Sequence, residues 1–240
     1  MIFTHPSLRQ EYLLMLRYVI PALLATFGAA LPARAEDRLS IDIYAIPSRP
    51  VVDAVEKASR DLAGRGMTTF YAKGQAPHVT LYLTQYLADA APRLKAAVAA
   101  AAKDCKAVPL TVNGTERTAS NWLFLHVERS PELQRLADLV TLAAEPLRDR
   151  TVTPLGWMSA YPAKLPAFER YGSPNVFMQF EPHLTLLANE SNPALAAFMT
   201  DMERTPPKAR GEVEGIGIGL VDGDGQLVKT LAEFHCTGRS

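Results

Sequence analysis

The tetrapeptide pattern His-apolar-Thr-apolar occurs twice in this chain, at His78–Leu81 and at His183–Leu186, and each copy directly follows a proline. In a β-strand successive side chains point to opposite faces, so each histidine shares a face with the threonine two residues later. The apolar residues of each copy then point the other way, into a core. The repetition therefore predicts two strands that each present one imidazole and one hydroxyl on the same face.

The segments that follow the two motifs also correspond. A helix is expected after each motif strand, and a further strand begins at the same distance from each histidine, at Val108 and at Val213. The next strand begins near Asn121 in one half and near Gln226 in the other, again at matching distances. We therefore expect two copies of a strand-helix-strand-strand unit, a duplication that can place the motif strands about a pseudo-twofold axis.

Hydrophobic periodicity and turn residues predict the other elements. Strands are expected over 39–46, 77–84, 108–112, 122–127, 177–187, 212–221 and 227–234, and helices over 51–62, 89–103, 130–147 and 193–203. Segment 149–175 is rich in proline and glycine and is predicted to be a long surface loop. Gly215, Gly217 and Gly219 fall on one strand face, which indicates the close approach of a ligand or a helix.

Residues 1–35 have the features of a secretory signal peptide. The apolar stretch 18–31 is followed by Ala33-Arg34-Ala35, a small-x-small cleavage pattern, so we expect Glu36 to begin the mature protein. The apolar stretch is short for a membrane span, although an uncleaved anchor is the alternative. We expect an exported protein, periplasmic or secreted, without a stable membrane anchor.

Charge and cysteine content limit the partners of the chain. The chain has 25 basic and 25 acidic side chains. Removal of residues 1–35 takes three arginines and one glutamate, which leaves a net charge of about −2. Long duplex nucleic acid is held by many phosphate contacts, so this balance argues against it, and we expect a monomer that binds a small nucleotide or a short RNA end. Cys105 and Cys236 form an even pair whose oxidation the sequence leaves open.

The twin motifs resemble the signature of the two-histidine phosphoesterase superfamily, which includes bacterial 2′-5′ RNA ligase-like proteins and cyclic phosphodiesterases. That signature is His-apolar-Thr/Ser-apolar, written twice, and the resemblance covers residues 39–236. It implies that His78 and His183 are the catalytic pair and that Thr80 and Thr185 bind the substrate phosphate. The family is mainly intracellular, so the predicted export of this chain is a departure that leaves the substrate open.

The resemblance also implies a fold. The expected class is α+β, with a bilobal, duplicated architecture in which two antiparallel sheets line a central groove and the helices pack outside. We expect one such domain over residues 36–240, with lobes of about 38–128 and 129–240.

The motif residues have the chemistry that phosphoester hydrolysis needs. An unperturbed imidazole titrates near pH 6.5, so at neutral pH one histidine can accept a proton while the other donates one. Threonine hydroxyls can donate to the phosphate oxygens as negative charge builds. Neither motif has a second histidine, a cysteine or a carboxylate at ligand spacing, so we expect no metal and no cofactor. The sequence leaves open which histidine is the acid.

Other residues near the motifs are open to two interpretations. Period-two counting places Tyr82 on the groove face beyond Thr80, as a substrate contact or as an ordinary half-buried strand tyrosine. Lys73 and Arg170, on the approaches to the motifs, are either phosphate contacts or solvated loop charges. His126 has no hydroxyl two residues later, and a structural role is expected for it.

The leading hypothesis is an exported, metal-independent phosphodiesterase acting on a 2′,3′-cyclic phosphate or a 2′-5′ linkage in a nucleotide or short RNA. One alternative is a non-catalytic nucleotide- or oligonucleotide-binding protein that keeps the phosphate cradle. Another is a phosphodiesterase that acts on a non-nucleotide envelope substrate. The motif pair supports the reaction class, while the substrate rests on family analogy.

Overall fold

Seven strands form one antiparallel sheet in the computed structural model, which describes residues 38–103, 105, 108–154, 158–159 and 161–236. The predicted signal peptide lies outside these residues. The strands are β1 (Arg38–Pro47), β2 (Val79–Leu87), β3 (Pro109–Arg117), β4 (Leu123–Val127), β5 (His183–Leu187), β6 (Ala209–Val221) and β7 (Leu227–His235). Their order is β2-β1-β6-β3-β4-β5, and β7 pairs with β6.

Strand β6 corrects the expectation of two separate sheets. Its first residues, 209–212, pair with β3, and residues 213–220 pair with β1 while 215–221 pair with β7. A strand of 13 residues is long enough to pair with β3 at one end and with β1 and β7 at the other, so the sheet is continuous. The element order β2-α2-β3-β4 does recur as β5-α5-β6-β7. Duplication into two lobes stays a prediction.

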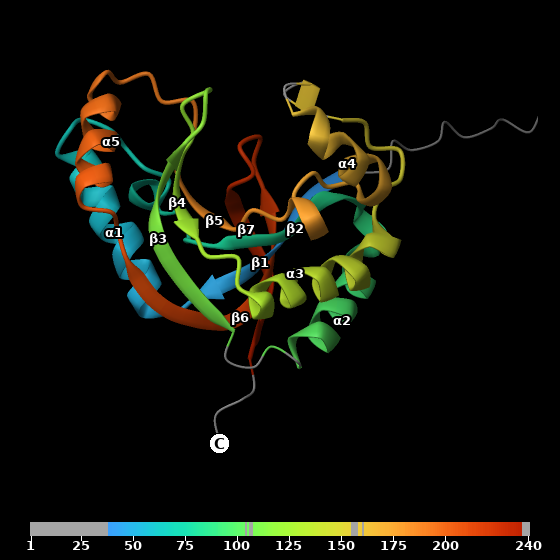
Figure 1. Ribbon diagram of the computed structural model, residues 1–240. Coiled ribbons are helices and arrows are strands. Elements are labelled where there is room, and N and C mark those ends of the chain that lie inside the picture. The colour runs from blue at the N-terminus through green and yellow to red at the C-terminus, as the bar shows by residue number, and fades with distance from the viewer. Residues whose placement is uncertain (1–37, 104, 106–107, 155–157, 160, 237–240) are drawn as a thin grey trace, which may run out of the picture. The chain divides into compact units, whose positions relative to one another are not determined.

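Within the described part of the chain, five α-helices lie outside the sheet, and the α+β class is confirmed (Figure 1). They are α1 (Arg49–Ala63), α2 (Ala91–Ala102), α3 (Pro131–Ala144), α4 (Leu165–Tyr171) and α5 (Ala194–Arg204). Helices α2 and α3 pack together beside β2, β6 and β7, while α1 and α5 pack against the part that contains β3 and β5. Helix α3 begins at an N-cap, where the Ser130 hydroxyl accepts a hydrogen bond of 3.1 Å from the Leu133 amide.

Two predicted elements differ from the structure. The predicted loop 149–175 contains helix α4, which has a proline in its first turn and ends at Gly172 in the left-handed conformation. The strand predicted over 177–187 begins only at His183, because Phe177–Gln179 forms a 3-10 turn and Pro182 has no amide hydrogen to donate. The proline and glycine content of segment 149–175 thus predicted a loop where the structure has helix α4.

The apolar residues of both motifs are buried as predicted. Val79, Leu81 and Leu186 are completely inaccessible, and Leu184 is 1% exposed. Burial of side chains of this size stabilises the fold by about 1.5–3 kcal/mol each, which fixes the strand register and hence the face on which the histidines lie. No helix within the described ranges is long and apolar enough to span a membrane.

The ends of the sheet meet. Strands β2 and β5, which carry the two motifs, are the first and last in the strand order, and they contact each other. A flat sheet would hold its terminal strands apart, so the twist and curvature of this sheet bring the motifs together. The site therefore forms between elements that are remote both in sequence and in the order of strand pairing.

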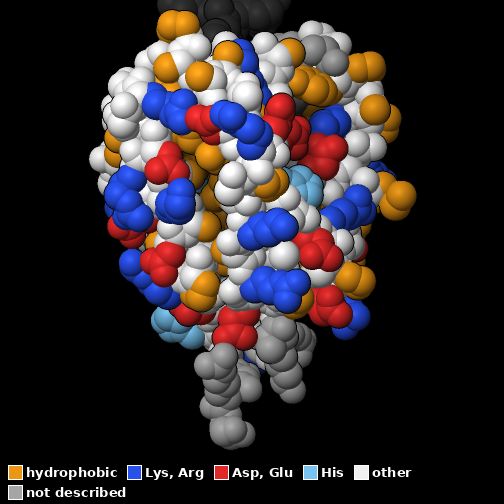
Figure 2. Space-filling view, turned by 60° about the vertical axis from the view of Figure 1, so that its left-hand side comes forward, with side chains coloured by type: hydrophobic (Ala, Val, Ile, Leu, Met, Phe, Trp, Pro, Cys, Tyr) orange, Lys and Arg blue, Asp and Glu red, His pale blue; other side chains and the backbone are white. Residues whose placement is uncertain are grey.

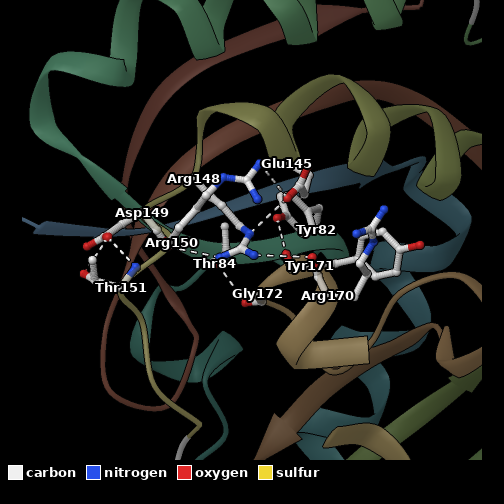
Figure 3. Close-up of polar contacts among 10 residues, drawn as sticks. All are labelled: Tyr82, Thr84, Glu145, Arg148, Asp149, Arg150, Thr151, Arg170, Tyr171 and Gly172. Atoms are coloured by element: carbon white, nitrogen blue, oxygen red, sulfur yellow. Dashed lines mark hydrogen bonds and ion pairs between the residues drawn. The ribbon is translucent and has the colours of Figure 1, made fainter. Parts of the chain in front are cut away.

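The C-terminal end of helix α4 is hydrogen-bonded to side chains of β2 (Figure 3). The Tyr82 hydroxyl donates to the carbonyl oxygen of Tyr171 at 2.6 Å, and the Thr84 hydroxyl donates to that of Gly172 at 2.7 Å. The nearly buried Arg148 guanidinium lies 3.2 Å from the Glu145 carboxylate and donates to the Arg170 carbonyl oxygen at 3.3 Å. These bonds satisfy backbone carbonyls that the end of α4 would otherwise leave unpaired.

A disulfide joins Cys105 to Cys236, which answers the question that the sequence left open. Their Cα atoms are 5.2 Å apart, and the bond spans a sequence separation of 131 residues. It ties the segment before β3 to the end of β7. Closing so long a loop restricts the unfolded chain strongly.

We expect replacement of both cysteines by serine to lower the free energy of unfolding by about 2–4 kcal/mol, because the unfolded chain regains the freedom that the cross-link removes. Urea denaturation measures this change. A reductant should destabilise the wild type by a similar amount and leave the double variant unaffected. Equal midpoints for the oxidised wild type and the variant would contradict the prediction.

Gly172 and Gly74 offer a matched pair of substitutions, because both have positive φ, +70° and +87°. Gly74→Ala should cost about 1 kcal/mol from backbone strain alone, since a Cβ there meets nothing within 4 Å. A Cβ at Gly172 would lie 2.8 Å from Arg148 Cδ and 2.9 Å from Thr84 Oγ1. We therefore expect Gly172→Ala to cost about 1–3 kcal/mol more than Gly74→Ala in urea denaturation. Equal losses would show that the attachment of α4 tolerates a methyl group.

Candidate active site

Both motif histidines are held by the same backbone hydrogen bond. Nδ1 of His78 lies 2.9 Å from the carbonyl oxygen of Ala76, and Nδ1 of His183 lies 2.8 Å from that of Glu181. A carbonyl oxygen only accepts, so each Nδ1 carries a proton and each neutral imidazole has its lone pair on Nε2. The intervening prolines have a fixed φ, which favours this turn in both motifs. Both Nε2 atoms are therefore available for proton transfer.

The first histidine lies beside a buried carboxylate. Nε2 of His78 is 3.4 Å from Oδ2 of Asp42, and the Thr80 hydroxyl donates to the same oxygen at 2.7 Å. Asp42 lies in β1, between β2 and β6, and is completely inaccessible. The Tyr44 ring meets the His78 imidazole edge to face, with 5.5 Å between the ring centres. His78 is 7% exposed, so this surrounding is almost dry.

The second histidine has aromatic and polar neighbours instead. The Phe124 ring packs against the His183 imidazole with 4.2 Å between ring centres. His126 is the cross-strand partner of His183, so the two imidazoles share a face of the sheet. His126 is exposed, and its Nδ1 contacts the Asn113 side chain at 2.5 Å. His126 is thus exposed beside the second motif, and a structural role for it stays a prediction.

Burial shifts the proton affinities of these groups. Desolvation lowers the pKa of His78, with a further lowering from the charge of His183, against a raising effect of the Ala76 hydrogen bond. Desolvation also lowers the pKa of His183, although the Glu181 hydrogen bond and the Glu116 carboxylate oppose it. Burial raises the pKa of Asp42 to about 8, and the Thr80 hydrogen bond opposes that rise. Neither histidine by itself thus has the unperturbed pKa that the sequence led us to assume.

The two motifs contribute to one pocket. His78 and Thr185 line it together with Tyr71 and Gln226. The structure therefore brings one predicted site residue of each motif, His78 and Thr185, to the same pocket, while Thr80 and His183 are not among the residues that line it.

Asp42 and Tyr44 were missed by the motif-based prediction. Asp42 lies in the predicted strand Leu39–Ile46, between two fully buried residues. A carboxylate flanked by apolar residues in a strand is unusual, and this was the signal in the sequence that could have indicated a functional residue. Tyr44 explains one glycine of β6, because a Cβ on Gly217 would collide with the Tyr44 ring. A Cβ on Gly215 or Gly219 would instead come closest to Phe234 or Leu227 of β7. The close approach predicted at these glycines is thus made by residues of the adjacent strands rather than by a ligand or a helix.

Tyr82 does not share the face of Thr80. Tyr44 pairs with Thr80 but Ile43 pairs with Tyr82, so the register shifts by one residue between them. Since Ile43 and Tyr44 point to opposite faces, Thr80 and Tyr82 do as well, and period-two counting fails across this bulge. Tyr82 is completely buried and its hydroxyl is bound to Tyr171 (Figure 3).

Lys73 and Arg170 are exposed and lie in other surroundings. The Lys73 ammonium is 5.1 Å from the centre of the Phe70 ring, and Lys73 lines a second pocket with Glu190 and Asp224. The Arg170 guanidinium is 5.9 Å from the centre of the Tyr171 ring, at the end of α4 (Figure 3). Contact of either residue with a phosphate stays a prediction.

Charge on the surface is mixed. Figure 2 shows one face of the molecule, on which acidic and basic side chains intermingle and a histidine lies exposed between them. This face therefore carries no continuous basic stripe of the kind that long nucleic acid requires. Within the described ranges, no group of three or more His, Cys, Asp or Glu side chains is placed to hold a metal ion.

Comparison with known proteins identifies the family. The chain matches the 2′-5′ RNA ligase superfamily over residues 47–225, whereas no curated protein matches it. The protein TT0787 of Thermus thermophilus is 18% identical in sequence, with a TM-score of 0.56 over 84% of this chain and 100% of its own, which shows a common fold. LigT of Escherichia coli complexed with 3′-AMP is 15% identical, with a TM-score of 0.48 over 84% of this chain and 99% of its own. Since the family match includes most of the chain and both motifs, this chain belongs to the 2′-5′ RNA ligase superfamily of two-histidine phosphoesterases.

Proposed function

We propose that this protein is a metal-independent phosphodiesterase that hydrolyses a 2′,3′-cyclic phosphate or a 2′-5′ phosphodiester in a nucleotide or short RNA. One observation carries the proposal: His78 and Thr185, from different motifs, line the same pocket. In addition, the charge of His183 contributes to the lowered pKa of His78. Both imidazoles are anchored through Nδ1, so proton transfer falls to Nε2 in each, and Nε2 of His78 also lies 3.4 Å from Asp42 Oδ2.

The reaction needs one base and one acid on opposite sides of phosphorus. One Nε2 takes a proton from the attacking water, and the other imidazole gives a proton to the departing ribose oxygen as the P–O bond breaks. Each such transfer contributes roughly 10²–10⁴ to the rate. Hydroxyl groups that donate to the non-bridging oxygens stabilise the negative charge that builds there.

The two threonine hydroxyls differ in their surroundings. A hydroxyl has one proton, and that of Thr80 is donated to Asp42. Donation from Thr80 to a phosphate oxygen thus requires its hydroxyl to turn away from Asp42. Thr185 lines the pocket that His78 shares, and we propose that it makes the first contact with the phosphate.

We also propose that the protein is exported to the periplasm or secreted. The Cys105–Cys236 disulfide supports this location, because such bonds persist mainly in oxidising compartments. A location outside the cytoplasm favours one further candidate, a non-nucleotide phosphodiester of the cell envelope. Both candidates require the same acid-base chemistry and differ in the group that carries the phosphate.

We expect the mature protein to hydrolyse at least one member of a panel of 2′,3′-cyclic nucleotides, 2′-5′ oligonucleotides and linear diesters in the presence of EDTA. His78→Ala and His183→Ala should each lower kcat by roughly 10²–10⁴, because each removes one proton transfer. His235→Ala is the matched control, since His235 is an exposed histidine of β7 outside both motifs, and its rate should equal that of the wild type.

The outcomes separate the candidate functions. No turnover of any nucleotide by the wild type contradicts the nucleotide proposal, and hydrolysis of a glycerol-linked cyclic phosphate alone would then favour the envelope substrate. Turnover that survives loss of either histidine contradicts the two-histidine mechanism. Nucleotide binding without turnover, measured by calorimetry, identifies a binding protein that keeps the phosphate cradle.

A further inference from the structure

We propose that Asp42 and His78 hold one proton as a pair, and that this makes His78 the general acid and His183 the general base. The inference rests on the proposed function and deepens it, because the two motifs by themselves leave these roles undecided. Asp42 acts through His78 and Thr80, so it is a positioning residue rather than a catalytic one.

The surroundings of Asp42 require that it share a proton. Its Oδ2 accepts from Thr80 and lies 3.4 Å from Nε2 of His78, while its Oδ1 is buried with no hydrogen-bond partner. No lysine or arginine forms an ion pair with Asp42 among the described residues. An isolated carboxylate in a dry site is too costly to remain charged, so a proton stays either on Asp42 or on His78. In both cases the pair has no net charge.

The second motif has no such carboxylate. Among the described residues, His78–Asp42 is the one ion pair that includes a motif histidine, while His183 contacts the Glu181 carbonyl oxygen and the Phe124 ring. The charged groups that act on His183 are Glu116, Glu181 and Lys164, and the Glu181 carboxylate is itself paired with Lys164 at 2.5 Å. His183 therefore lacks a group with which to share a proton.

Every strand packed around Asp42 leaves the pair isolated from other charges. From β1, Tyr44 contacts His78, and burial raises the pKa of its hydroxyl, so it stays neutral. From β2, Thr80 is uncharged, and Tyr86, on which the Asp42 charge acts, stays neutral because burial raises its pKa. From β6, the residues opposite Asp42 and Tyr44 are glycines, and from β7 the Glu233 carboxylate accepts from the far end of Tyr44 at 3.4 Å. His183 is the remaining titratable group that acts on His78.

The directions of the pKa shifts support this assignment. As the pH falls, the Asp42–His78 pair takes up the shared proton near pH 8, because burial raises the pKa of Asp42 to about 8. Burial lowers the pKa of His183 below the ordinary value of 6.5. Between these limits the Asp42–His78 pair is protonated and His183 is not. This is the state that a reaction with one acid and one base requires.

The proton balance of the step is simple. His183 Nε2 takes the proton of the attacking water as the new P–O bond forms, and His183 becomes a cation. When the shared proton is on Nε2 of His78, it passes to the departing ribose oxygen as the bond of that oxygen to phosphorus breaks, which leaves neutral His78 beside an Asp42 carboxylate. Release of one proton from His183 to solvent and uptake of one by the pair restore the starting state.

The first test is the pH dependence of kcat/KM for the wild type and Asp42→Asn. Asparagine keeps an acceptor for Thr80 but cannot hold the shared proton. We expect the basic limb to move from about pH 8 to below pH 6.5, because His78 alone has a lowered pKa. At pH 7.5 this corresponds to a loss of at least about eightfold. A basic limb that stays in place in Asp42→Asn overturns the proposal, even if the rate falls uniformly.

Asp149→Asn is the matched control. Asp149 is also a buried carboxylate, but it is held by Arg38 at 2.6 Å and by the Thr151 hydroxyl at 2.7 Å, away from both motifs. This variant should lose stability and keep the position of the basic limb. A shift of the limb in Asp149→Asn as large as that in Asp42→Asn overturns the assignment to Asp42.

The second test requires neither turnover nor a folded Asp42 variant. The imidazole nitrogens of His78 and His183 can be titrated by NMR in the wild type, with assignment from the histidine variants. We expect a step near pH 8 at His78 alone, and a step at His183 below pH 6.5. Identical titrations of the two imidazoles overturn the proposal. If the wild type hydrolyses no diester, the proposed function fails, while this titration still decides the role of Asp42.

Discussion

The contact between strands β2 and β5 is the constraint on which the site depends. These strands are the two ends of the strand order, and only a strongly curved sheet brings them together. Strand β6 makes that curvature possible, because it pairs first with β3 and then with β1 and β7. The four motif residues therefore owe their arrangement to pairing across the whole sheet and not to local structure.

Dryness gives the site its chemistry. Burial lowers the pKa of both histidines, which favours their neutral forms. Two neutral histidines can act as bases, but a further group is needed to supply an acid. The buried Asp42 supplies that group, because the same desolvation raises the pKa of a carboxyl while it lowers that of an imidazole. Motifs that are alike in sequence are thus placed in unlike surroundings, and the difference comes from one residue of the central strand β1.

The sequence predicted what depends on local pattern. The buried apolar positions of both motifs, the N-cap at Ser130 and the hairpin of β6 and β7 all follow from periodicity, capping and turn residues. It was wrong where one residue of register or a short helix intervened. Period-two counting placed Tyr82 beside Thr80, yet a bulge in the pairing with β1 reverses its face. Helix α4 was concealed by a proline-rich segment.

By itself the sequence determined the motif strands, the imidazoles and hydroxyls they carry, and the family to which they belong. The position of each histidine proton is also local, because Nδ1 bonds to a carbonyl only two residues away. Only the tertiary structure decided that Asp42 faces His78, that Phe124 faces His183 and that the cysteines are joined. These contacts depend on strand register and sheet curvature, which arise from the summed packing of distant residues and leave no mark in a short segment.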